Sequence, residues 1–254
     1  MKRVRALLAA CLLLVAPLVA VTATPAHADE IPTFDFIDCP DLPEGADPRF
    51  WNCNVIIITS GKFILGKFDQ NITEPMKITY ATGLDPVTRK TITVFGRLRA
   101  EKMLVRPGIF GDPILTAVYA LPQYAGHFEV KPGPIWDMWL KVRIMNPALG
   151  PNCRLGKDSD AIKLSLILGT TNPPPPNTPI SGKPAELVST NPPIQKATIV
   201  DNSFAVPGAN GCGLNFGLLN AVVNSQAGTP AAAGRNTAIF NQFGSFKRYT
   251  EIVS

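Results

Sequence analysis

Five acidic residues recur at every third position near the start of the chain, beside or between two cysteines. They are Asp35, Asp38, Asp41, Glu44 and Asp47, and the cysteines are Cys39 and Cys53. Carboxylate oxygens are the ligands that calcium prefers, so a cation site is the first hypothesis. The spacing also matches the three-residue turn of polyproline II, in which neighbouring acids would lie about 9 Å apart along a straight ridge.

A straight ridge does not suit a metal, because calcium needs roughly six to eight oxygens that converge on one point. We therefore predict that the acidic ridge is a solvated edge or lies against a basic strand face. Weak calcium binding is the alternative, since a bridge between Cys39 and Cys53 would bend the segment. We predict no metal site and no cofactor.

Four cysteines follow Cys11, and their even number predicts two disulfide bonds in an exported chain. They are Cys39, Cys53, Cys153 and Cys212. Of the possible pairings we favour Cys39 with Cys53, because this pair is local and leaves Cys153 with Cys212 by default. A structural zinc site is the alternative use of four cysteines, but the chain has no C-x-x-C pair.

Basic residues on the polar faces of predicted strands are the candidates for surface binding. They are Arg97, Arg99, Lys141 and Arg143, with Lys77 and Lys163 on further strands. If these strands neighbour one another, their outer face is a basic stripe that suits an acidic cell-wall polymer. An ordinary solvated sheet face is the competing interpretation.

The sequence contains no recognisable catalytic motif. His127 is the one histidine after residue 28, and no G-x-S-x-G motif accompanies it, so we expect a structural or surface histidine. Residues 61–67 (GKFILGK) have phosphate-loop spacing, but Phe68 replaces the magnesium-binding Ser or Thr, which favours a β-turn between strands. Carboxylates for glycan hydrolysis can come from distant strands, so a hydrolase stays open.

Short β-like segments must position these side chains. Residues 54–59 form an apolar run typical of a strand buried on both faces, and residues 91–100 alternate with a period of two. Similar patterns predict strands at 76–80, 114–120, 139–145, 162–168 and 195–206. Proline and glycine turns separate them. The pattern predicts an all-β sandwich, Ig-like or jelly-roll-like, with many short strands.

Two segments differ from this pattern. Residues 170–184 contain six prolines, which predicts an extended crossover connector or linker, with a ligand for a proline-recognising module as the alternative. Residues 214–223 place Leu214, Leu218 and Val222 at steps of four, beside Leu219 and Val223. We expect a short C-terminal amphipathic helix that packs on the body.

The first 28 residues have the pattern of a cleaved secretory signal peptide, with a basic start, an apolar run and Ala26-His27-Ala28. Loss of its three basic residues lowers the formal net charge from +5 to +2. This removes the electrostatic motive for nucleic-acid binding, and we expect no membrane span after cleavage.

The predicted organisation follows from these segments. It consists of a signal peptide (1–28), a disulfide-closed acidic arm (29–54), a sandwich body (55–169), a proline-rich connector (170–184), and remaining strands with a short helix (185–254) that complete the same domain.

The last fifty residues carry a resemblance. Residues 204–213 (FAVPGANGCG) and 217–242 (GLLNAVVNSQAGTPAAAGRNTAIFNQ) are similar to a group of exported actinobacterial proteins without a known activity. The resemblance implies a bacterial cell-envelope or extracellular setting. It implies no catalytic residue.

Together these patterns predict a secreted, non-catalytic extracellular or cell-envelope protein with a binding or structural role. A cell-wall polymer or another envelope component is the expected partner. The alternative is a secreted hydrolase that acts on glycans or esters. Converging carboxylates in a cleft, or His127 beside a serine, would favour the enzyme.

Overall fold

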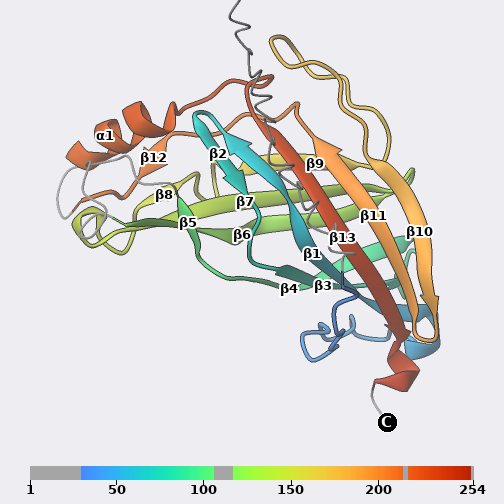
Figure 1. The fold of residues 1–254 in the computed structure, drawn as a ribbon. Helices are drawn as coiled ribbons and strands as arrows, with labels where there is room; N and C mark the ends of the chain where they lie inside the picture. Colours follow the sequence, from blue (N-terminus) through green and yellow to red (C-terminus); the bar gives the residue numbers. More distant parts are fainter. Residues whose placement is uncertain (1–29, 106–116, 214–216, 253–254) are drawn as a thin grey trace, which may run out of the picture. The chain divides into compact units, whose positions relative to one another are not determined.

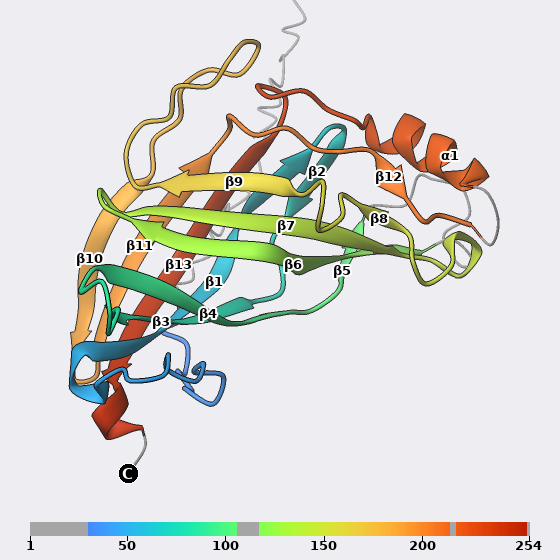
Figure 2. The same ribbon diagram turned by 180° about the vertical axis from the view of Figure 1, so that it is seen from behind.

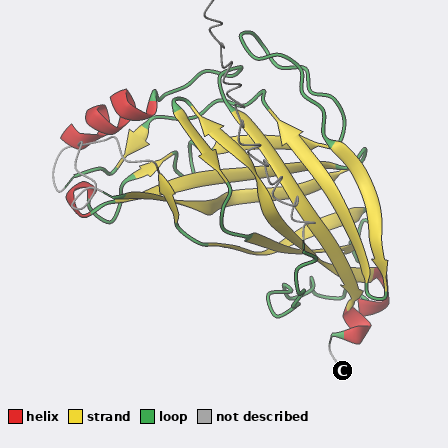
Figure 3. Cartoon of the chain, viewed as in Figure 1, coloured by secondary structure: helices red, strands yellow, loops and turns green. Residues whose placement is uncertain are grey.

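The computed structural model describes residues 30–105, 117–213 and 217–252, and the chain from Pro32 to Ser254 forms one compact unit. Its described residues build thirteen strands of one antiparallel sheet, which folds over itself without closing. The result is the predicted all-β sandwich with a short C-terminal helix (Figures 1 and 3). No helix in the described ranges is long and apolar enough to span a membrane.

The first layer contains six long strands and one short one. In spatial order they are β10 (Lys183–Thr190), β11 (Pro193–Asp201), β13 (Thr237–Arg248), β1 (Trp51–Leu65), β3 (Met76–Leu84) and β4 (Thr91–Ala100), while β2 (Phe68–Asn71) pairs with the end of β1. The last long strand of the chain, β13, therefore lies between β1 and β11, near the middle of this layer.

The second layer faces the first (Figure 2). Its strands are β5 (Met103–Val105), β6 (Val118–Lys131), β7 (Ile135–Met145), β8 (Arg154–Leu155), β9 (Ile162–Ile167) and β12 (Ala209–Asn210). The pair Val200–Ile167 joins β11 to β9. At the other edge β4 lies beside β6, where the Val130 N–H donates to the Thr93 hydroxyl at 3.3 Å.

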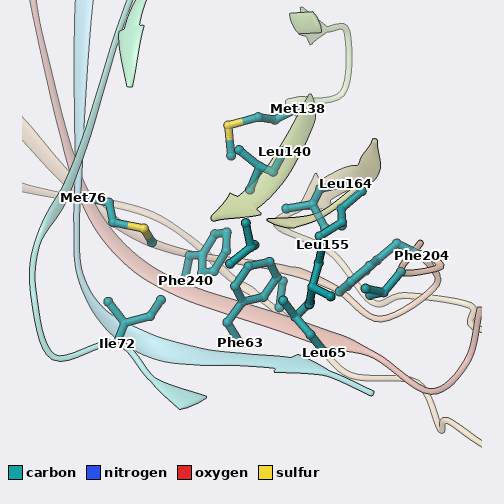
Figure 4. Close-up of a cluster of buried hydrophobic side chains, with 14 of the residues drawn as sticks. Phe63, Leu65, Ile72, Met76, Met138, Leu140, Leu155, Leu164, Phe204 and Phe240 are labelled. Carbon is teal, nitrogen blue, oxygen red and sulfur yellow. The ribbon is translucent and has the colours of Figure 1, made fainter. Parts of the chain in front are cut away.

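The main core fills the space between the two layers, as Figure 4 shows. Phe63 of β1 and Phe240 of β13 pack edge to face with ring centroids 5.6 Å apart. Leu140 of β7 and Leu164 of β9 join the same cluster from the second layer. Alternating side chains enter this core because successive residues of a strand point to opposite faces.

The strand predictions are confirmed where the structure describes the residues, except that the predicted strand 195–206 ends at Asp201, the last residue of β11. The predicted strand 91–100 matches β4 in extent, but a register shift at Gly96 turns Ile92 and Val94 to the outer face and leaves Leu98 and Ala100 in the main core. Residues 54–59 lie inside β1. Within β1, Val55 to Ile58 are all buried, as expected for a strand covered on both faces. Residues 61–65 continue β1, and a turn at Gly66-Lys67 leads to β2, so GKFILGK belongs to a hairpin. Part of the predicted strand 114–120 lies outside the described residues.

A second, smaller core lies on the outer face of the first layer, beneath the N-terminal arm (residues 32–50). Trp51, Cys53, Ala81 and Tyr249 are buried there, with apolar arm residues packed against them. A Cβ atom on Gly83 would lie only 2.2 Å from the Trp51 ring. Glycine at this position lets the indole lie flat on β3. The arm ends in the 3-10 helix η1 (Pro48–Phe50), and the described C-terminal end forms η3 (Tyr249–Glu251).

The proline-rich residues between β9 and β10 form a docked crossover. Asn177 donates from its side-chain amide to the carbonyls of Asn202 and Asn236 at 2.9 and 2.8 Å. Asn202 in turn donates to the Thr178 carbonyl at 2.8 Å. These bonds hold the connector against the loops that flank β11 and β13.

The C-terminal helix α1 (Leu218–Ala227) overlaps the predicted segment 214–223, but only part of the predicted apolar face is buried. Leu218 is 76% exposed, and Val222 is also exposed. Val223 and Ala227 are fully buried instead, with Leu219 packed against the main core. The prediction is thus correct for Leu219 and Val223 and wrong for Leu218 and Val222, while Leu214 lies outside the described residues. A short helix offers two overlapping apolar stripes, and only tertiary contacts select one. The 3-10 helix η2 (Pro147–Leu149) lies after β7.

Candidate functional site

Both predicted disulfide bonds are confirmed. Cys39 bonds to Cys53 and Cys153 bonds to Cys212, with all four cysteines in the favoured pairing. Zinc binding by these thiols is thereby contradicted. Disulfides persist in oxidising compartments, so the two bonds fit an extracellular protein.

The acidic arm lies against the basic outer face of β3 and β4. Asp38 has a side chain only 5% exposed and accepts two hydrogen bonds from Arg99, at 2.5 and 2.6 Å. Lys77 bridges Asp38 and Asp35 at 3.1 and 2.7 Å. The hydrogen bond from Arg99, together with Lys77, lowers the pKa of Asp38 from 3.8 to about 2 despite the opposing effect of burial.

The five acids do not converge on one point. Asp41 and Glu44 are exposed, while Asp47 accepts from the Arg49 N–H at 3.0 Å as the N-cap of η1. Asp38 already uses both oxygens for cationic partners. The calcium hypothesis is therefore not supported, and the alternative that placed the ridge against basic strands describes Asp35 and Asp38.

The four predicted basic residues lie on both sides of β6. Arg97 and Arg99 belong to β4, which packs beside β6, while Lys141 and Arg143 belong to β7, which pairs with β6. The condition for one continuous basic stripe, that these strands neighbour one another, is not met for β4 and β7 in the sheet.

Carboxylates of the chain also form ion pairs with part of this basic surface. Arg99 binds Asp38, and Lys141 forms an ion pair with Asp158. Arg97 is 62% exposed and lies 3.8 Å from Asp38. The positive charge left for an acidic polymer is accordingly smaller than the sequence suggests.

A group of ionisable side chains surrounds His127 on the outer face of the second layer. Between β6 and β7 the register shifts at Tyr124/Phe128, and Gly126 adopts φ 95°, a left-handed value that favours glycine. This bulge brings the His127 ring to 4.8 Å from the Trp139 ring. Lys163 lies over the same indole at 4.6 Å.

Carboxylates complete this group. His127, Glu129 and Asp137 offer ligand atoms within 4.8 Å of one another, the spacing of a possible metal site. Lys131 forms ion pairs with both carboxylates, so one of their two negative charges is already compensated. A cation would have to displace this ammonium group.

Asp137 and Asp201 flank Ser165 and differ in their acidity. The Ser165 hydroxyl donates to Asp137 at 2.8 Å, and its backbone N–H donates to Asp201 at 2.7 Å. Burial raises the pKa of Asp201. Burial also acts to raise the pKa of Asp137, but hydrogen bonds from Lys131 and Ser165 outweigh it, and the pKa is lowered.

A partly enclosed cavity of about 130 Å³ opens at the β10 end of the sandwich, between the two layers. Tyr80 of β3 and Gln242 of β13 line it from the first layer, and Trp136 of β7 lines it from the second. Further lining residues come from four strands and the end of β9; they include Asn54, Ile56, Leu168, Ala185, Gln195, Ala197, Gly244 and Phe246. We call this feature the inter-layer cavity.

The inter-layer cavity combines neutral polar groups with aromatic rings. Gln242 is 5% exposed, and its carbonyl oxygen Oε1 has no hydrogen-bond partner within the described chain. The Trp136 indole nitrogen Nε1 is also buried, and it makes no hydrogen bond of good geometry in the described chain. A weak interaction of this N–H with the Tyr80 hydroxyl opposes the rise in the Tyr80 pKa that burial causes.

Buried polar groups without a partner indicate where a ligand could supply the missing hydrogen bonds. Leaving a buried polar atom without a partner costs about 1–3 kcal/mol, and most native proteins avoid it. Among the described lining residues, the one ionisable side chain is Tyr80, and its raised pKa keeps it neutral. The inter-layer cavity is therefore suited to an uncharged ligand that donates and accepts hydrogen bonds.

The sequence predictions missed this cavity. In β13, inward-facing Ala238 and Phe240 are followed at the same spacing by Gln242. A glutamine in an apolar series was the available signal, but it identified neither Trp136 nor Tyr80 as its neighbours.

Comparisons with known proteins add no relative. A scan of family models, a search of curated proteins and a search of solved structures each returned no match for this chain.

Proposed function

We propose that the protein is exported and acts outside the cell as a non-catalytic binding protein of the cell envelope, with the inter-layer cavity as its ligand site. The observation that carries this proposal is the buried, unpaired carbonyl of Gln242 in a cavity lined by Tyr80 and Trp136. The signal-peptide pattern, two disulfide bonds and the resemblance to exported actinobacterial proteins support the location.

The cavity supports binding rather than catalysis. Its described lining carries no carboxylate, histidine or lysine that could act as an acid or base at neutral pH. His127 lies on the outer face of β6, away from the cavity. The Ser165 hydroxyl donates a hydrogen bond to Asp137.

A hydrolase remains a second candidate for one specific reason. Asp137 and Asp201 adjoin the same serine, and their pKa values are shifted in opposite directions, which is the pattern of an acid–base pair. Its site would be the outer face near His127, away from the cavity.

The experiment incubates the purified protein with isolated bacterial cell walls and measures both retained protein and released soluble products. We expect retention without products, and at least a 10-fold weaker retention for Gln242→Leu. The control is Gln123→Leu, on β6, which should be retained like the original chain.

Two results would contradict the proposal. Equal retention of Gln242→Leu and the original chain would exclude the cavity as the binding site. Released products that disappear in Asp137→Asn would instead identify the hydrolase.

A further inference from the structure

The size of the inter-layer cavity limits the part of a ligand that can enter it. Its volume is about 130 Å³. A buried cavity of about 150 Å³ accommodates benzene, so this smaller, partly open cavity can enclose at most one six-membered ring, with the rest of the ligand at the opening. The opening lies beside exposed Phe246 and Gln195, which leaves room for a longer chain to continue into solvent.

The side chains that line the cavity determine which kind of ring can bind there. Aromatic side chains at Tyr80, Trp136 and Phe246 offer apolar surfaces, while Gln242 offers an amide. An amide both donates and accepts, and a hydroxyl group does the same. A benzene-like ring would leave the Gln242 carbonyl unpaired, whereas a hydroxyl group on the ring can donate to it, and a hydroxyl oxygen can accept from the Trp136 N–H, which interacts only weakly with Tyr80.

The neutral lining of the cavity also excludes ligands that carry a charged group. A carboxylate or phosphate on the ring would be desolvated among neutral side chains, without a cation in the described lining. An ammonium group would likewise be desolvated without a carboxylate in the described lining to compensate its charge. The ring must therefore be neutral as well as hydroxylated.

We propose that the inter-layer cavity holds one neutral sugar ring at the end of a glycan chain. This inference rests on the proposed binding function. The apolar face of the ring packs against the aromatic side chains. One hydroxyl group donates to Gln242 Oε1, and a hydroxyl oxygen accepts from Trp136 Nε1. The remainder of the glycan leaves past Phe246.

The test uses the full protein after signal removal and follows the indole N–H signals by NMR. The probes are methyl glycosides of neutral hexoses, the uronic acid of the same ring, and benzene. We expect the neutral glycosides to shift the Trp136 signal, which Trp136→Phe identifies by its loss. The Trp51 N–H is also buried and unpaired, but it lies under the N-terminal arm, so its signal is the internal control and should stay fixed.

Two variants sharpen the result. Gln242→Leu should weaken glycoside binding by at least 10-fold and also raise the thermal midpoint of the free protein, because it removes an unpaired buried amide. Trp136→Phe keeps an aromatic ring and should weaken binding about 10-fold. Gln123→Leu should change neither property.

The outcomes separate this inference from the proposed function. Binding of benzene without the glycosides, or preference for the uronic acid, would overturn the neutral-sugar assignment while the cavity remained a binding site. No probe bound, together with cell-wall retention that still depends on Gln242, would likewise reject the sugar ring and keep the binding function. Failure of both retention and probe binding would reject both.

Discussion

At the scale of single residues, Asp38 is the acid of the N-terminal arm whose surroundings affect stability most. Its carboxylate is almost fully buried among Arg99, Lys77 and the more distant Arg97. A buried carboxylate is costly unless cations and hydrogen bonds compensate it. The arm therefore depends on its protonation state.

We expect Asp38→Asn to lower the free energy of unfolding at pH 7. The folded pKa is depressed to about 2 from 3.8, so the carboxylate contributes stability above pH 3.8 and loses it as the pH falls toward 2. After allowance for solvent screening at exposed Arg97 and Arg99, this contribution is about 1 kcal/mol. Urea unfolding between pH 7 and pH 2 measures it.

The difference between Asp38→Asn and the original chain should shrink over that acidic interval. Glu44→Gln alters an exposed acid of the same arm and should change stability by less than about 0.5 kcal/mol. A variant difference that stays constant from pH 7 to pH 2 would show that the carboxylate charge does not hold the arm.

At the scale of elements, the N-terminal arm acts as a cover for the outer face of β1 and β3. The Cys39–Cys53 bond closes a short loop, and the Tyr249 hydroxyl donates to the Pro40 carbonyl at 2.7 Å. Beneath them Trp51 is 1% exposed. The arm thus buries an indole that would otherwise face water.

We predict that Cys39→Ala with Cys53→Ala lowers the free energy of unfolding by about 3 kcal/mol, the chain-entropy value for a loop of this size. It should also expose Trp51 to oxidative labelling, located by mass spectrometry. The matched control removes Cys153 and Cys212, whose sequence separation is 59. That change should cost about 4 kcal/mol yet leave Trp51 protected under native conditions; equal labelling in both variants would contradict this division.

At the scale of the whole molecule, β13 connects parts that are distant in the sequence. It pairs with β1 on one side and with β11 on the other, for example through Ile57–Phe243 and Ile199–Phe240. We therefore expect the first layer to need β13 before it can assemble. Such non-local pairing makes folding slow, because long loops must close before the contacts form.

We expect a chain that ends at Asn236 to lose cooperative unfolding, because it lacks all of β13. A chain that ends at Glu251 keeps β13 and Tyr249 and should retain it. Circular dichroism and intrinsic fluorescence during urea titration distinguish the two. A cooperative transition in the shorter chain would show that β1 and β11 can assemble a stable layer without the central strand.

The sequence by itself determined the local properties of this protein. Period-two alternation in residues 91–100 identified β4, and the count and spacing of the cysteines identified Cys39–Cys53. These signals succeed because strand conformation and closure of a short loop depend on nearby residues. The register shift at Gly96, which exchanges the two faces of β4, depends on pairing with β3 and was not predicted.

The tertiary structure alone decided which distant segments meet. It placed β13 at the centre of a layer, chose Val223 over Leu218 as a buried residue of α1, and set Gln242 opposite Trp136. Strand order, register and the approach of two layers depend on packing between residues far apart in the chain, which no local pattern records. The candidate ligand cavity exists only through that packing.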